Sequence, residues 1–115
     1  MFSLSSYHRF EFYAKACDMR KGFDSLCGLV RNELARDPTC GEVFVFLNRP
    51  RNMIKMLHWE VGGLVIYHKR LEKGTFAIPK LMAGQSQIHW PEFVLMIEGI
   101  SVEKVARKRR FEVLK

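Results

Sequence analysis

The sequence predicts an α+β fold, in which a mostly antiparallel sheet of four or five strands with a meander core carries one long helix on one face and a short second helix near the C-terminus. Three observations predict it. Apolar, β-branched and aromatic stretches follow one another closely at residues 43–47, 53–59 and 64–71, as in a meander. Apolar residues recur at helical spacing between residues 23 and 34. Pro91 begins a second amphipathic stretch.

The first elements are a strand and the long helix. Aromatic residues alternate with polar ones between residues 6 and 16, which predicts a strand. Asp18 is placed to cap the helix expected at residues 22–35, and the residue before Pro38 ends it. We expect one face of this helix to be buried against the sheet, through Phe23, Leu26, Val30 and Leu34.

The meander follows the helix. Residues 48–52 supply a turn after the strand at 43–47, and the glycine pair Gly62–Gly63 supplies the next. Residues 75–78 read as a short edge strand, and residues 80–87 as a surface loop. The second helix is expected at residues 91–98, closing one end of the sheet with Gly99 as its C-cap.

Length and composition indicate one domain. The chain has 115 residues, of which 48% are hydrophobic and 27% charged, as in globular proteins. We expect a single α+β domain at residues 1–103 and a basic tail at 104–115. No apolar run approaches the ~20 residues of a membrane span, and no secretory signal is expected. The three cysteines form no C-x-x-C pair, so a cytoplasmic protein without a disulfide framework is expected.

The charge balance indicates a polyanionic partner. Nineteen Lys and Arg against twelve Asp and Glu give a net charge of +7, which favours nucleic acid. The cations concentrate between residues 49 and 73 and in the tail, and antiparallel pairing would place the first group on one ridge, interleaved with Trp59 and Tyr67. Cations also protect strand edges and solubilise disordered tails, so both readings stay open. The candidate DNA-binding residues are Arg20, Lys21, Arg49, Arg51, Lys55, Lys69, Arg70, Lys73, Arg107, Lys108, Arg109 and Arg110.

The sequence predicts no enzyme, cofactor or metal. No phosphate-binding loop or nucleophile motif occurs. His58 and His68 would approach each other across neighbouring strands, but they lack the third ligand that zinc needs. The spacing of Asp18, Asp24, Glu60 and Glu72 forces no carboxylate pair together, so capping and ion pairing are the expected uses.

Several segments together resemble a known family. They are Asp18-Met19-Arg20-Lys21-Gly22, Gly41-Glu42-Val43-Phe44-Val45-Phe46, Ile54-Lys55-Met56-Leu57-His58-Trp59-Glu60, and Tyr67-His68-Lys69-Arg70-Leu71-Glu72-Lys73-Gly74-Thr75-Phe76. The chain resembles, over nearly its whole length, the TnpB (Orf2-like) accessory proteins of insertion sequences of the IS66 group, in their Bacteroides-type form. Val61, where a polar turn residue is expected, departs from the pattern.

The resemblance implies a role in bacterial DNA recombination by a mobile element. A separate transposase would cut and join the DNA, and this chain would be a non-enzymatic accessory factor, cytoplasmic and nucleoid-associated. Its expected partners are the DNA of the element ends, the element-encoded transposase, or both, and no membrane. The alternative is a protein–protein adaptor that binds the transposase and never contacts DNA. The sequence leaves the oligomeric state open.

Overall fold

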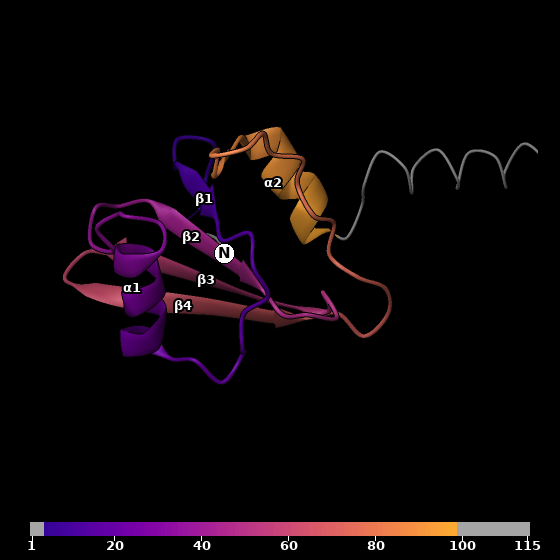
Figure 1. The fold of residues 1–115 in the computed structure, drawn as a ribbon, viewed down its shortest axis with the longest axis horizontal. Coiled ribbons are helices and arrows are strands. Elements are labelled where there is room, and N and C mark those ends of the chain that lie inside the picture. The colour runs from indigo at the N-terminus through magenta and orange to yellow at the C-terminus, as the bar shows by residue number, and fades with distance from the viewer. Residues whose placement is uncertain (1–3, 99–115) are drawn as a thin grey trace, which may run out of the picture.

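The computed structural model describes residues 4–98, which form one mixed five-stranded sheet between two helices (Figure 1). In chain order the elements are β1 (Phe10–Phe12), α1 (Phe23–Asn32), β2 (Val43–Leu47), β3 (Met53–Glu60), β4 (Gly63–Arg70), β5 (Gln87–Ile88) and α2 (Trp90–Ile97). The strand order across the sheet is β4-β3-β2-β1-β5. This confirms the α+β class that the sequence predicts.

The sheet is mixed, and the prediction of a mostly antiparallel sheet was wrong in this respect. β2, β3 and β4 do form an antiparallel series, with Val45 opposite Met56 and Leu57 opposite Ile66. β1, however, runs parallel to β2, with Phe10 opposite Val43. α1 lies between these two strands in the chain and carries it back across the sheet, so both strands run in the same direction.

The helix α1 is shorter than predicted, ten residues at Phe23–Asn32 rather than residues 22–35. The chain leaves the helix at Glu33 and reaches a positive φ of 54° at Ala35. Gly22, not Asp18, stands at the N-cap position, and the Asp18 carboxylate accepts the N–H of Arg20 at 2.9 Å.

The expected buried face of α1 was only partly right. Leu26 and Val30 are fully buried, in a cluster with Phe44, Phe46 and Leu57 of the sheet. Leu34 is half-buried at the rim of this cluster, and Phe23 is 48% exposed. The apolar face of the helix thus extends beyond the apolar part of the sheet.

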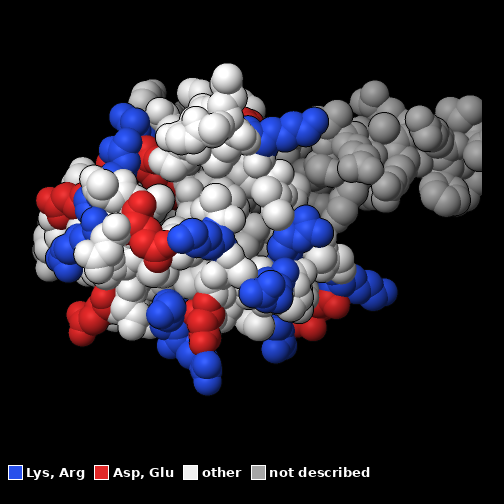
Figure 2. All heavy atoms as spheres, viewed as in Figure 1, with Lys and Arg blue, Asp and Glu red and all other residues white. Residues whose placement is uncertain are grey.

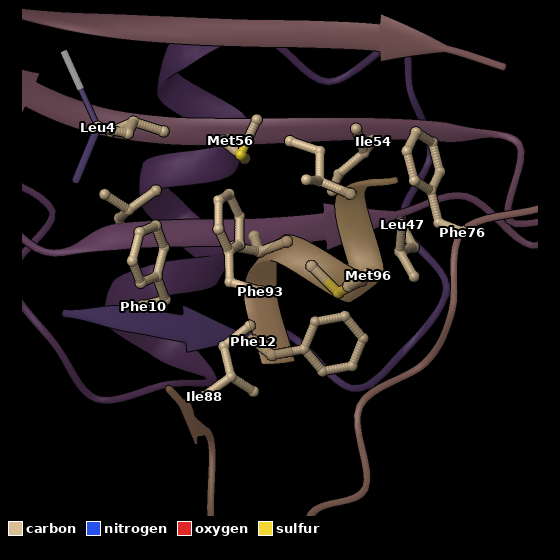
Figure 3. Packing of buried hydrophobic residues seen from close by; sticks show 13 residues of the cluster. Leu4, Phe10, Phe12, Leu47, Ile54, Met56, Phe76, Ile88, Phe93 and Met96 are labelled. Carbon is tan, nitrogen blue, oxygen red and sulfur yellow. The ribbon is translucent and has the colours of Figure 1, made fainter. Parts of the chain in front are cut away.

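The second face of the sheet is covered by α2, which the sequence placed at one end of the sheet. Phe93 stacks on Phe10 with ring centroids 4.1 Å apart, and Met96 is buried in the same cluster as Met56 (Figure 3). The helix begins at Trp90, and the backbone N–H of His89 donates to Glu92 Oε1 at 3.3 Å. Two buried clusters, one on each face, therefore hold the sheet between the helices.

The segment between β4 and β5 contains no strand, so the edge strand predicted at residues 75–78 was wrong. Phe76 instead enters the α2-side cluster as a fully buried side chain. The loop predicted at residues 80–87 holds except at its end, where β5 pairs antiparallel with β1. Neither helix within residues 4–98 is long and apolar enough to cross a membrane. The basic tail and the predicted Gly99 cap lie outside the described residues.

Candidate nucleic-acid interface

The turn between β2 and β3 is built around one buried side chain, that of Asn48. Its Oδ1 accepts the backbone N–H groups of Asn52 and Met53, both at 3.0 Å, and its Nδ2 donates to Asn52 Oδ1 at 2.7 Å. An asparagine that bonds the following backbone in this way fixes a turn. The turn presents Arg49 and Arg51, both exposed, at the end of the sheet.

Arg51 is held in an unfavourable backbone conformation, with a φ of 61°. A non-glycine residue there costs about 1–3 kcal/mol and persists only where its surroundings fix it. The carbonyl of Arg51 accepts the N–H of Phe76 at 2.6 Å, and the carbonyl of Asn52 accepts the N–H of Leu71 at 2.8 Å. The segment at 71–76 is thereby fastened to the turn, and it brings Lys73 and the end of β4 to the same place.

Strand register adds three more cations to this end of the sheet, Lys55, Lys69 and Arg70. Arg70 lies opposite Met53, Lys69 lies opposite Ile54, and Lys55 lies opposite His68. We name the group formed with the turn the basic patch; it consists of Arg49, Arg51, Lys55, Lys69, Arg70 and Lys73. Figure 2 shows Lys and Arg side chains gathered at the end of the molecule where this turn lies. The only acids in the sequence between residues 47 and 77 are Glu60, at the far end of β3, and Glu72.

The basic patch wraps around the end of the sheet and is not the single ridge that the sequence suggested. Side chains alternate between faces along a strand, so Lys55 and Arg70 lie on the α1 face and Lys69 on the α2 face. Lys55 Nζ donates to the carbonyl of Lys21 at 2.8 Å, and Lys69 Nζ donates to the carbonyl of Ile97 at 3.4 Å. Both lysines therefore also support the fold, Lys69 as a cation at the C-terminus of α2.

Arg49, Arg51 and Lys73 differ from these lysines, because no side-chain hydrogen bond or ion pair within residues 4–98 engages them. Arg70 pairs with Glu72, its one ion-pair partner in the described part of the chain, at 3.4 Å between two exposed side chains, and such pairs are weak. The cations that are most available to a partner are thus those of the turn and of the segment fastened to it.

Two other predicted residues, Arg20 and Lys21, lie in the loop before α1. Arg20 donates to both carboxylate oxygens of Asp18, with Nη2 2.7 Å from Oδ2, and this bonding lowers the pKa of Asp18 to about 2. The charge of Arg20 is therefore already paired. Lys21 is half-buried, and its backbone carbonyl accepts the hydrogen bond from Lys55 Nζ. Arg107, Lys108, Arg109 and Arg110 lie outside the described residues.

Of the two aromatic side chains expected among the cations, Trp59 lies elsewhere, and Tyr67 is engaged in the fold. Trp59 is opposite Leu64, four residues along β3 from Lys55. Tyr67 packs against the α2-side cluster, and its hydroxyl donates to Glu60. The basic patch is therefore suited to phosphates more than to stacked bases.

His68 lies opposite Lys55 of the basic patch, and the charges of the patch affect its pKa. Burial lowers the pKa of His68 from its ordinary value of 6.5, and the positive charges of Lys55 and Arg70 lower it further. His68 is consequently neutral in the free protein at neutral pH, although a nearby anion would favour its charged form.

A charged network at the other end of the sheet was not predicted from the sequence. Glu11, in the middle of β1, is fully buried, and it accepts hydrogen bonds from Ser86 Oγ and from Arg9 Nε at 3.0 Å. The guanidinium of Arg36 bridges two carboxylates, with Nη2 3.2 Å from Glu11 and Nη1 3.0 Å from Glu42. The one sequence signal is a glutamate between Phe10 and Phe12 in a strand with no solvent-facing side.

The arrangement offers no metal-binding cluster within residues 4–98. His58 lies on the α2 face and His68 on the α1 face, so they cannot share a metal ion. No group of three His, Cys, Asp or Glu side chains in this part of the chain is placed to hold one. Asp18, Glu60 and Glu72 are bonded to Arg20, Tyr67 and Arg70 respectively.

Comparison with known proteins places this chain. The family model described as "IS66 Orf2 like protein" matches residues 8–107. The chain belongs to the IS66 Orf2-like family. Members of this family are accessory proteins of insertion sequences and not a known class of enzyme.

Two relatives of the chain are uncharacterized proteins of one bacterial strain. The uncharacterized protein y4jC of Sinorhizobium fredii (strain NBRC 101917 / NGR234) is 33% identical over 91 residues, which cover 79% of this chain and 78% of the relative. The uncharacterized protein y4hO of the same strain is 32% identical over 83 residues, which cover 72% of each chain. No solved structure matches the chain. The family supports a role in transposition.

Proposed function

We propose that this IS66 Orf2-like protein is a non-enzymatic accessory factor that binds the phosphates of element-end DNA through the basic patch. One observation carries the proposal. The β2–β3 turn is fixed by Asn48 and fastened to the segment at 71–76, so it holds Arg49, Arg51 and Lys73 together as exposed cations. A rigid cationic site loses little conformational entropy on binding a phosphate backbone.

The chemistry of transposition would then belong to the transposase alone. The basic patch supplies positive charge and hydrogen-bond donors, and the neighbouring acid Glu72 already pairs with Arg70. Such a surface positions DNA but does not cut it. The protein would deliver or hold an element end while the transposase acts.

A binding titration with the purified full chain tests the proposal. We expect the affinity for element-end duplex to fall with salt, with log affinity against log salt of slope about −4 to −5 if four to six phosphates are contacted. Scrambled duplex of equal length and added transposase are the other arms. Affinity that is independent of salt, or binding that appears only when transposase is present, would refute DNA contact and favour the adaptor role.

The pH dependence of binding provides a second prediction. DNA affinity should rise as the pH falls from neutral into the mildly acidic range, because phosphates favour the charged form of His68, whose pKa is lowered in the free protein. The lowered pKa also means that folding favours neutral His68, so this stabilisation is lost as the pH falls through the folded-state pKa. The measurement is a binding titration from neutral to mildly acidic pH. His68→Gln should flatten the rise, and an unchanged pH profile in that variant would contradict the assignment.

A further inference from the structure

The outer edge of β4 is an open sheet edge. β4 is the last strand of the sheet, and no strand within residues 4–98 pairs with its outer side. It is eight residues long and pairs with β3 in continuous register, without a bulge. Proteins usually protect such edges with bulges, prolines, charges or short strands. In β4 the cations, Lys69 and Arg70, occupy only the last two positions, so Gly63–Tyr67 is an unprotected uncharged stretch.

Exposed apolar side chains border the same edge. Val61, in the two-residue hairpin loop before β4, is fully exposed, and Phe23, the first residue of α1, is 48% exposed. Figure 1 shows α1 starting on the side of the sheet where β4 lies and ending on the side of β2. A strand edge without charged side chains, bordered by exposed apolar side chains, is typical of a protein interface.

We propose that β4 pairs antiparallel with β4 of a second copy of this chain, so that one sheet continues through a two-fold dimer. The charge pattern of the strand selects this occupant. Antiparallel self-pairing sets Lys69 and Arg70 of each copy against the uncharged half of the other copy. Parallel pairing would set like charges opposite each other, which is unfavourable. The strand is thus complementary to itself in one direction only.

The two-fold symmetry has consequences for the rest of the molecule. The axis of an antiparallel strand pair is perpendicular to the sheet, so both copies carry α1 on the same face. The start of each α1, with Phe23, then turns toward the dimer axis. The β2–β3 turn lies beyond β3, at the end of the sheet, and stays accessible in both copies. Arg49 and Arg51 therefore stay available to DNA in the dimer, whereas Lys69 and Arg70 of the basic patch lie in the paired strand.

Sedimentation velocity of the full chain, without DNA, tests the dimer over low to high micromolar concentrations. The matched variants are Leu64→Lys and Leu64→Glu, which lose the same half-buried apolar side chain and differ in charge alone. Because the dimer is symmetric, the substituted residue of each copy would face the cationic half of the partner strand, so the contact occurs twice. We expect the dimer of Leu64→Lys to be roughly tenfold weaker than that of Leu64→Glu.

Hydrogen exchange of the unmodified chain gives a second readout that does not depend on how the variants fold. Amide protection within residues 63–70 should increase with protein concentration, whereas protection of α2 should not. A monomer at every concentration, equal dimer affinity of two folded variants, or concentration-dependent protection confined to another element would each overturn the proposal.

Discussion

Arg36→Ala is expected to lower the free energy of unfolding by about 3 kcal/mol, because removing one partner of a buried ion pair leaves an uncompensated charge. Glu11 is fully buried, and the guanidinium groups of Arg36 and Arg9 both join it to Glu42. Arg9 and Ser86 remain bonded to Glu11, so the loss falls at the lower end of the range for broken buried pairs. Urea denaturation followed by the fluorescence of the two tryptophans measures it.

Arg36→Lys and Arg20→Ala are the matched controls. A lysine keeps the charge of Arg36 but lacks the planar fork that reaches two carboxylates, so it should restore only part of the stability. Arg20 also pairs with a carboxylate, that of Asp18, but its side chain is 91% exposed. Its removal should leave the unfolding midpoint nearly unchanged. Equal effects of Arg36→Ala and Arg20→Ala would show that the network contributes nothing beyond a surface pair.

The strands were predictable from the sequence because burial and β-propensity agree there. Residues 43–47 are apolar throughout and prove to be buried on both faces, as a central strand requires. The partner of the first strand was not predictable, because alternation identifies a strand without identifying its neighbour. Phe23 shows a similar limit. Helical spacing places Phe23 on the same face of α1 as Leu26, but it does not show whether the apolar surface of the sheet reaches far enough, at β4, to bury it.

The candidate site was predictable in its composition but not in its shape. The cations of the turn and of β4 are evident in the sequence, whereas the division of Lys69 from Lys55 and Arg70 depends on the register between β3 and β4. Phe76 was read as part of a strand because it lies among apolar residues. Its N–H instead bonds to the carbonyl of Arg51, a contact between distant residues that no local pattern contains. That contact places Lys73 beside the turn.

Arg49→Gln combined with Arg51→Gln is expected to weaken DNA binding by roughly tenfold to a hundredfold, as two charge-assisted hydrogen bonds are lost. The slope of log affinity against log salt should become shallower by up to ~2, because about one counterion is released per phosphate contact. Neither arginine supports the fold through its side chain within residues 4–98, so the variant should unfold at the same urea concentration as the unmodified chain. Fluorescence anisotropy of labelled element-end duplex at several salt concentrations provides both quantities.

The control for net charge is Lys15→Gln combined with Arg31→Gln, which removes the same two charges from the region near the end of α1. A phosphate contact at the turn predicts that this control keeps nearly all of the affinity, since long-range attraction alone is screened beyond about 10 Å at ordinary salt. Sequence preference separates two modes of contact in the turn variant. Phosphate contacts would leave the ratio of element-end to scrambled affinity unchanged, whereas base contacts in a groove would lower it. Equal losses in the turn variant and the control would mean that the protein attracts DNA by its overall charge, and the basic patch would then have no specific role.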